Sequence, residues 1–168
     1  SSGAALEWFG PTRTVGTEAL SLSGTGISSG GALRDVSGEN SYGGAITLAA
    51  DASIVDYANS LTLSGSVACG ANTLTLAVSA TAVTISGNIS GTKTTGNGAL
   101  VKSGSGYLSL SGDNSSLTGD INLNEDEIRI GAANALAGGG KLIMAGSTEL
   151  KSGSATDRTV TKNLTING

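Results

Sequence analysis

One short pattern recurs along this chain: an apolar residue, any residue and a second apolar residue, often followed by one more residue and a glycine. The copies that end in glycine lie at 20–24, 61–65, 83–87, 108–112, 142–146 and 164–168. Shorter copies lie at 46–48, 74–76, 121–123 and 128–130. In a β-strand, residues two apart share a face, so both apolar side chains point inward and the residue between them points outward. Such short strands must stack on copies of themselves to bury their apolar faces.

Two folds suit short, evenly spaced strands, a sandwich of hairpins and a parallel β-solenoid. Hairpins need two-residue turns such as Asn-Gly, and Asn97-Gly98 is the only clear one before the terminal Asn167-Gly168. The sequence therefore predicts an all-β chain, a parallel β-helix spanning 1–168 as a single domain. At roughly 20–25 residues per coil, the 168 residues form about seven coils. The alanine-rich stretch 130–138 is predicted to be a single helical turn or a wide loop.

The two ends of the chain also resemble each other. Residues 6–24 align with 150–168 through a shared Arg-Thr-Val and a shared apolar-x-apolar-x-Gly, with offsets of 158 − 13 = 145 and 168 − 24 = 144. The chain thus begins and ends at the same phase of a repeat of about 145 residues, with 1–24 matching 146–168. This predicts either a segment of a tandem array or a subunit that stacks end to end on itself.

Composition supports an ordered β-protein. The chain has 27 glycines, one proline, no histidine and only 3% aromatic residues. Disorder is typical of low hydrophobicity with high net charge, whereas 38% of these residues are apolar and the net charge is −4. The glycines separate short apolar runs, so they indicate turns.

Charge and residue types exclude several functions. A net charge of −4 argues against nucleic acid as a partner. No run approaches 18 apolar residues, so we expect no membrane insertion in this segment. The absence of histidine excludes Ser-His-Asp and Cys-His catalysis and nearly excludes zinc. We expect Cys69 to be a buried apolar residue, the chain to need no cofactor, and the protein not to be an enzyme.

The middle of the chain resembles a known family. Residues 102–114 read K-S-G-S-G-Y-L-S-L-S-G-D-N, which looks like the K-S/T-G-x-G-x-L-x-L-S-G-x-N signature of the autotransporter-associated β-strand repeat. The specific match covers about residues 98–138, with Leu117 in place of the usual aromatic residue and 124–127 in place of the usual Gly-Thr turn. The resemblance implies a right-handed β-helix of a bacterial protein that is extracellular or displayed at the cell surface.

The acidic run 124–127 is the densest group of carboxylates. If it bulges from a coil, it could hold a weak calcium ion. The simpler interpretation is a solvated loop between Leu123 and Ile128.

The outward positions of the predicted strands are mostly hydroxyl or amide residues. They are Thr47, Thr62, Thr75, Thr84, Ser109, Asn122 and Thr165. With the coils in register, some would form a hydroxyl ladder, and Thr62, Thr75 and Thr84 are candidate contacts for a glycan or a partner protein. The alternative is that threonine simply suits a solvated strand. Ice binding would require pairs of threonines on one face, which one threonine between two leucines does not provide.

Trp8 and Phe9 stand out in a chain so poor in aromatic residues. Because they are adjacent in an extended segment, they face opposite sides and only one can be a core residue. They are candidates for an interface, such as an end-to-end contact, or for core packing.

We therefore expect a structural repeat scaffold, such as a stalk, fibre or adhesin shaft, whose partner is itself, end to end. The alternative is a β-helix module that binds a surface glycan or a host protein. A third class, a polysaccharide-cleaving enzyme, needs a cleft that gathers two carboxylates, or a carboxylate with Arg13, Arg34 or Arg129.

Overall fold

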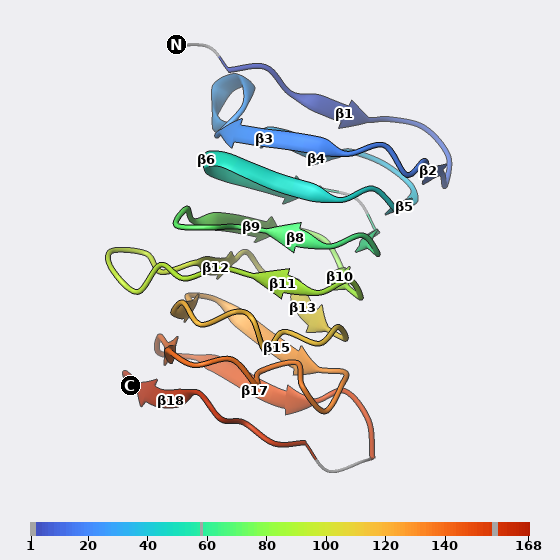
Figure 1. Ribbon diagram of the computed structural model, residues 1–168. Helices are drawn as coiled ribbons and strands as arrows, with labels where there is room; N and C mark the ends of the chain where they lie inside the picture. Colours follow the sequence, from blue (N-terminus) through green and yellow to red (C-terminus); the bar gives the residue numbers. More distant parts are fainter. Residues whose placement is uncertain (1–2, 58, 156–157) are drawn as a thin grey trace.

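The computed structural model describes residues 3–57, 59–155 and 158–168. The chain winds into a stack of about seven turns, as the sequence predicts, and Figure 1 shows it descending from the N-terminus to the C-terminus. One sheet contributes one strand to each turn, and all its neighbouring strands are parallel. Its strands are β2 (Thr14–Val15), β5 (Glu39–Tyr42), β7 (Ser60–Leu63), β10 (Ala82–Ile85), β13 (Tyr107–Leu110), β15 (Asp126–Ile130) and β17 (Thr148–Ser152).

The second sheet has 11 strands and covers the rest of each turn. Its main row is β1 (Leu6–Trp8), β4 (Leu33–Asp35), β6 (Ile46–Asp56), β9 (Leu74–Val78), β12 (Leu100–Ser103), β14 (Ile121–Leu123), β16 (Lys141–Met144) and β18 (Asn163–Ile166). A short side row consists of β3 (Leu20–Gly24), β8 (Val67–Ala68) and β11 (Ile89–Ser90). The long strand β6 belongs to both rows: residues 46–48 pair with β3, and residues 54–56 pair with β4.

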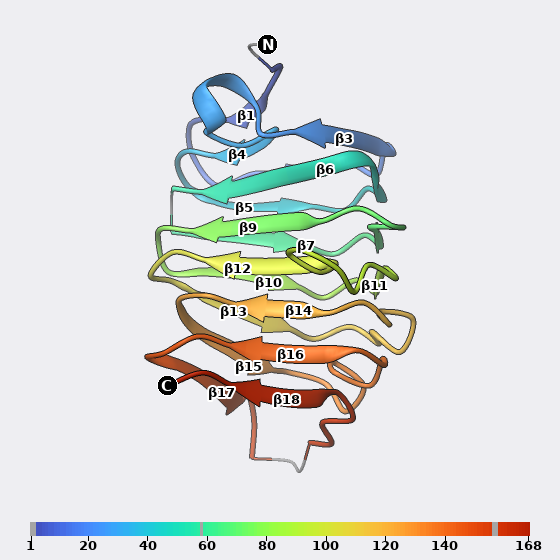
Figure 2. The same ribbon diagram turned by 90° about the vertical axis from the view of Figure 1, so that its left-hand side faces the viewer.

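The coil is right-handed. In Figure 2 the near strands run to the left and the far strands run to the right while the chain descends, which is the sense of a right-handed helix. The same hand is favoured for crossovers between parallel strands. The helix η1 (Ile27–Ser29) has three residues, and no helix among the described residues is long and apolar enough to cross a membrane.

Apolar columns run along the inside of the solenoid. In the seven-stranded sheet, register pairing stacks Leu61, Val83, Leu108 and Ile128, all at most 1% exposed. A second column stacks Leu63, Ile85, Leu110 and Ile130, all at most 3% exposed. Burying one such side chain contributes about 1.5–3 kcal/mol, so these columns account for the recurring apolar-x-apolar pattern.

The glycine that ends the pattern also has a structural reason. After β10, successive turns lie so close together that a Cβ on Gly87 would lie 1.9 Å from the carbonyl oxygen of Gly65. A Cβ on Gly112 would lie 2.2 Å from the carbonyl oxygen of Gly87. The glycines form a stack in which backbone touches backbone, and no side chain fits between the turns.

The copies of the pattern are not all equivalent, however. The copies that begin at Leu61, Val83 and Leu108 lie in the seven-stranded sheet, whereas 142–146 and 164–168 start as β16 and β18 of the other sheet. The copy at 20–24 is β3, in the side row. An apolar-x-apolar strand fits any side of the coil, so the pattern alone does not determine its place.

The matching chain ends illustrate the same effect. Leu6 lies in the 11-stranded sheet and its counterpart Leu150 in the seven-stranded one. Thr14–Val15 form β2, whereas their counterparts at 159–160 follow β17 outside any strand. Equivalent sequence at the two ends therefore falls on different sides of the coil. The tandem repeat itself stays a prediction.

The alanine-rich stretch is a wide loop. Residues 131–140 form successive turns without a helix, and hydrogen bonds join Ala135 N to Ala132 O and Ala137 N to Asn134 O. Ala135 and Leu136 are fully buried, so the loop closes that side of the coil in place of a strand.

Candidate functional site

The outer surface of the seven-stranded sheet carries a column of hydroxyl groups. Register pairing places Ser41, Thr62, Thr84 and Ser109 side by side on β5, β7, β10 and β13. The predicted ladder therefore includes two of the three candidate threonines. The third, Thr75, lies in the other sheet, on β9, between Ser53 and Val101. Thr75 therefore does not share a surface with Thr62 and Thr84.

A second hydroxyl column runs beside the first. Ser64, Ser86 and Ser111 follow the last residues of β7, β10 and β13, and their amides continue the ladder by donating to Tyr42 O, Leu63 O and Ile85 O. Each serine stands two residues after a member of the first column, so it points to the same side. The sequence did signal these serines, at the fourth position of the recurring pattern, but only the register shows that they line up. We call Thr62, Ser64, Thr84, Ser86, Ser109 and Ser111 the hydroxyl face.

Towards the C-terminal end, charged side chains continue the same surface. Arg129 and Lys151 follow Ser109 in its column. Arg129 pairs with Glu127 and stacks its guanidinium over the ring of Tyr107, with Cζ 3.5 Å from the ring centroid. Lys151 pairs with Glu127 at 2.5 Å and also with Glu149.

These ion pairs affect ionisation. Burial raises the pKa of Glu127, but hydrogen bonds from Lys151 and Arg129 outweigh it and hold that pKa below its usual value. Hydrogen bonds to Glu127 and Glu149 raise the pKa of Lys151. The cluster is thus balanced within itself, which suits a solvated end of the sheet better than an anion site.

Trp8 and Phe9 separate as expected. Trp8 is 6% exposed and packs against Tyr42, with ring centroids 5.6 Å apart, whereas Phe9 is 74% exposed. Trp8 is therefore a core residue, and Phe9 is the member of the pair that is available for a contact.

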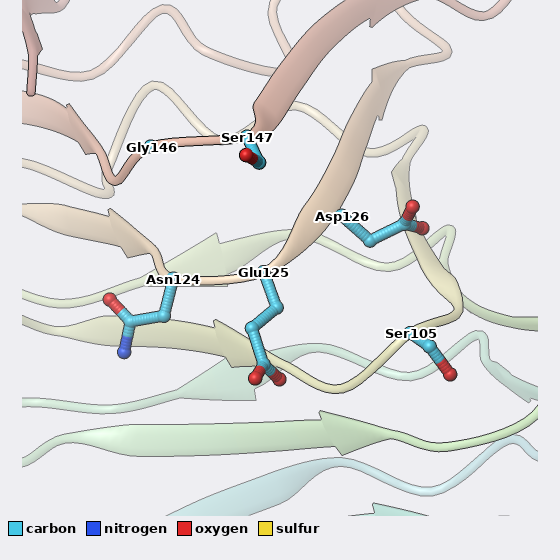
Figure 3. A pocket seen from close by; sticks show the side chains of 6 residues that line it. All are labelled: Ser105, Asn124, Glu125, Asp126, Gly146 and Ser147. Carbon is cyan, nitrogen blue, oxygen red and sulfur yellow. The ribbon is translucent and has the colours of Figure 1, made fainter. Parts of the chain in front are cut away.

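The acidic run forms part of a hollow at a corner of the coil (Figure 3). The hollow measures about 450 Å³ and is lined by Ser105, Asn124, Glu125, Asp126, Gly146 and Ser147. Lys102 extends from the apolar interior and donates to Glu125 O at 3.0 Å and Gly104 O at 2.6 Å. The Glu125 carboxylate accepts a hydrogen bond from the amide of Gly104.

The hollow gathers the two carboxylates that a polysaccharide-cleaving site requires at minimum. Figure 3 shows the two side chains extending in different directions. Within the described parts of the chain, no three His, Cys, Asp or Glu side chains lie close enough to hold a metal ion. The two carboxylates of the hollow therefore do not converge on one point.

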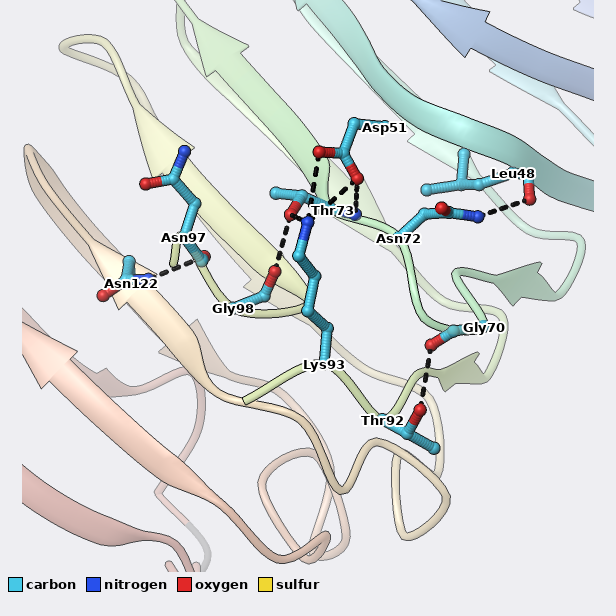
Figure 4. Close-up of polar contacts among 10 residues, drawn as sticks. All are labelled: Leu48, Asp51, Gly70, Asn72, Thr73, Thr92, Lys93, Asn97, Gly98 and Asn122. Carbon is cyan, nitrogen blue, oxygen red and sulfur yellow. Dashed lines mark hydrogen bonds and ion pairs between the residues drawn. The ribbon is translucent and has the colours of Figure 1, made fainter. Parts of the chain in front are cut away.

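A second polar cluster fastens a protruding loop (Figure 4). Lys93 donates to both carboxylate oxygens of Asp51, at 3.0 and 3.1 Å, and to Thr73 Oγ1 at 2.8 Å. Thr73 in turn donates its amide to Asp51 and its hydroxyl to Gly98 O, both at 2.7 Å. The amide of Thr73 and the ammonium of Lys93 lower the pKa of Asp51. Thr73 is 3% exposed, so the cluster holds the loop rather than presenting a reactive hydroxyl.

Several ionisable groups lie in the interior, and no sequence pattern signalled them. Asp35 and Asp56 are fully buried register partners on β4 and β6. Lys102 occupies an inward position between Leu76 and Leu123, and burial lowers its pKa.

Lys162 is 4% exposed and donates to the carbonyl oxygens of Leu117, Gly119 and Gly139. Burial lowers its pKa to about 8. Cys69 is buried as expected, and burial raises its pKa to about 12, so its thiol stays protonated and unreactive. The two buried lysines, Lys102 and Lys162, tie neighbouring turns together through backbone carbonyl groups.

Comparisons with known proteins add no relatives to this picture. No protein-family model, no curated protein and no solved structure matches the chain.

Proposed function

We propose that this chain is a structural repeat scaffold, a shaft of stacked coils extended at its ends by further coils of the same kind. The coils belong either to one longer polypeptide or to separate copies in a filament. We also propose that the scaffold is extracellular or displayed at a bacterial cell surface, on the family resemblance of residues 98–138.

One interior column supports this proposal most directly. It passes through eight strands of the main row without interruption and consists of Leu6, Leu33, Ile54, Leu76, Lys102, Leu123, Met144 and Ile166. Its inner apolar members are at most 8% exposed, but its two end members, Leu6 and Ile166, are 41% and 71% exposed. Each end of the column would bury its apolar side chain under another coil.

The rest of each end of the solenoid also exposes apolar side chains. At the N-terminal end a hollow of about 490 Å³ opens between β1 and β3 and is lined by residues such as Leu20, Leu22 and Ala32. At the C-terminal end Leu164 is 50% exposed. At the two ends, β1 and β18 each have one edge that pairs with no strand of the described chain. Such an edge is a template for another parallel strand. A contact of this head-to-tail kind does not close on itself, so it builds a fibre.

Electron microscopy of the purified chain over a series of concentrations tests this proposal. We expect filaments with an axial repeat of about seven coils, roughly 34 Å at the ~4.8 Å spacing of neighbouring strands. Isolated short rods at every concentration would contradict assembly through these ends. So would filaments that Ile166→Lys leaves unchanged.

A module that binds a glycan or a host protein is the second candidate. The observation that favours it is Phe9, which is 74% exposed in a chain with few aromatic residues. A glycan array separates the two proposals: binding by the wild-type chain that Phe9→Ala abolishes would support the module, and no binding would favour the scaffold. We propose no catalytic role, since the carboxylates of the corner hollow diverge.

A further inference from the structure

Two aspartates lie in the interior directly beneath the first turn of the solenoid. Asp35 on β4 and Asp56 on β6 are register partners on strands about 4.8 Å apart, and neither side chain has any exposed surface. The next residue of their column towards the N-terminus is Trp8 on β1, which belongs to the first turn. The next residue in the other direction is Val78 on β9. A single turn therefore closes the pair on one side, and the rest of the coil closes it on the other.

No ion pair of the described residues neutralises Asp35. Its hydrogen-bond partner is neutral: the side-chain amide of Asn40 donates to one oxygen at 2.6 Å. The other oxygen is buried and has no hydrogen-bond partner among the described residues. The charged side chains of the adjoining strands and turns lie at outward or exposed positions, and they are Glu7, Arg13, Glu18, Arg34 and Glu39. Of these, Glu7 and Arg34 pair with each other at 2.9 Å.

Ionising both carboxyl groups places two like charges side by side in an apolar interior. Burial raises the pKa of Asp35, against the opposing effect of the hydrogen bond from Asn40. A charge on Asp56 adds repulsion, so such a pair favours the state in which the two carboxyl groups hold one proton between them. The last proton of the pair therefore leaves above the usual aspartate pKa of about 3.9. Tyr42, which packs on Trp8, stays neutral in this range, because burial raises its pKa above the usual value.

The first turn is the part of the coil that separates most easily from the pair. β1 pairs with β4 and β2 pairs with β5, and neither β1 nor β2 pairs with a second strand of the described chain. The amide of Val36 donates to Trp8 O at 3.0 Å. The amide of Arg13 donates to Asn40 Oδ1 at 2.8 Å, so Asn40 connects Asp35 to the first turn. The contacts of this turn therefore pass through residues that adjoin the pair.

We propose that Asp35 and Asp56 form a pH-sensitive latch that controls the order of the first turn. While the pair holds its proton, Trp8 packs over it and residues 6–15 stay closed. When that proton is lost to solvent, the second charge favours hydration of the pair, and water enters by separating β1 from β4. The latch closes in acid and opens as the pH rises.

The first turn is also the N-terminal end on which another coil would stack. The latch therefore regulates assembly, since a closed β1 is an ordered template for a parallel strand and an open one is not. This consequence rests on the proposed scaffold function, whereas the opening of the turn does not. We expect end-to-end assembly to be stronger in acid than at neutral pH.

Acrylamide quenching of Trp8, the single tryptophan, between pH 4 and pH 8 without denaturant tests the latch. Trp8 is 6% exposed in the closed turn, so quenching is weak there. Within the titration range of the pair, each pH unit raises the ratio of open to closed turns by up to about tenfold. We expect quenching to rise with pH in the wild-type chain and to stay low in Asp35→Asn and in Asp56→Asn. The matched control, Asp126→Asn, changes an exposed aspartate on a distant turn and should follow the wild type.

Thermal melting at each pH checks that the coil and each variant stay folded. Constant quenching of the wild-type chain would overturn the inference, and this result decides alone if neither variant of the pair folds. A pH response that a folded Asp35→Asn or Asp56→Asn retains would overturn it as well.

Electron microscopy at the same two pH values separates the latch from the scaffold. Filaments that form equally at pH 4 and pH 8, together with constant quenching, would overturn the latch and leave the scaffold standing. A Trp8 response that the variants abolish, without filaments at pH 4, would support the latch and contradict assembly of separate copies.

Discussion

Asp35 and Asp56 stack directly upon each other on neighbouring turns, both with no exposed surface. The neighbours of this pair in its column are Trp8 before it and Val78 after it. Asn40 donates to one oxygen of Asp35 at 2.6 Å. Burial raises the pKa of Asp35, against the opposing effect of the hydrogen bond from Asn40. Two carboxylates in adjacent inward positions of a coil favour a state in which one of them keeps its proton.

The pH dependence of stability follows from this pair. Because the folded chain binds the Asp35 proton more tightly than the unfolded chain, this group stabilises most below the unfolded pKa of about 3.9. That stability is lost as the pH rises through the raised folded pKa. Asp35→Asn keeps an acceptor for Asn40 and removes the charge, so we expect its free energy of unfolding at pH 7 to exceed that of the wild-type chain.

Urea unfolding between pH 3 and pH 8 measures this, with fluorescence of the single tryptophan, Trp8, as the probe. Asp51→Asn is the control of opposite sign, because the pKa of Asp51 is lowered and its charge is stabilising at neutral pH. If Asp35→Asn destabilised the chain at pH 7 as much as Asp51→Asn, the charge of Asp35 would not lower the free energy of unfolding.

The stack of glycines predicts that even an alanine in place of one of them strongly lowers the free energy of unfolding. Gly87→Ala places a methyl group 1.9 Å from Gly65 O, so the turns must separate, and we expect a loss of about 3 kcal/mol or more. Gly139→Ala is the control, because a Cβ there has no other atom within 4 Å, and we expect a change within about 0.5 kcal/mol. Equal melting temperatures for the two variants would show that the turns are not in contact.

The hydrogen bonds of Lys162 predict a loss of stability when its ammonium group is removed. Lys162→Met removes the donor shared by three carbonyl groups near the wide loop, and leaving buried acceptors unpaired costs about 1–3 kcal/mol. Lys141→Met, at an exposed lysine of β16, should change the free energy of unfolding by less than about 0.5 kcal/mol. Hydrogen exchange at residues 131–140 locates the effect. Faster exchange only at distant turns after Lys162→Met would show that Lys162 does not hold this loop.

Much of the fold was predictable because it depends on local patterning. Alternation of apolar residues gave the strands, and the copy spacing gave about seven turns, since each strand must stack on the next. The same alternation explains why Cys69 is buried, and why Trp8 is buried while its neighbour Phe9 is exposed.

The side of the coil on which each strand lies was not predictable. It depends on turn length, and the register step between turns varies from 20 residues, between Leu108 and Ile128, to 28 residues, between Gly24 and Ala52. A pattern of period two carries no information about those lengths. Thr75 therefore lies apart from Thr62 and Thr84, and the inward positions of Asp35 and Lys102 emerge only from the register.

A disulfide cross-link between copies tests the central claim, end-to-end continuation of the coil, most directly. The outward column of the 11-stranded sheet that ends at Thr165 passes through Asn122, Thr75 and Ser53. At the N-terminal end the amide of Leu6 donates to Ala32 O at 2.9 Å, so extending the register of β1 and β4 by one residue places Ala5 next to Ala32. A copy that continues the coil therefore brings its Ala5 beside Thr165, at about 4.8 Å between Cα atoms, within the roughly 4.4–6.8 Å that a disulfide spans.

We predict that the double variant Ala5→Cys/Thr165→Cys forms a ladder of covalent multimers on oxidation. The control Glu7→Cys/Thr165→Cys moves one cysteine two residues along the strand, about 6.6 Å away, and should form no covalent multimers. No ladder from the first variant, or equal ladders from both, would contradict end-to-end stacking of separate copies.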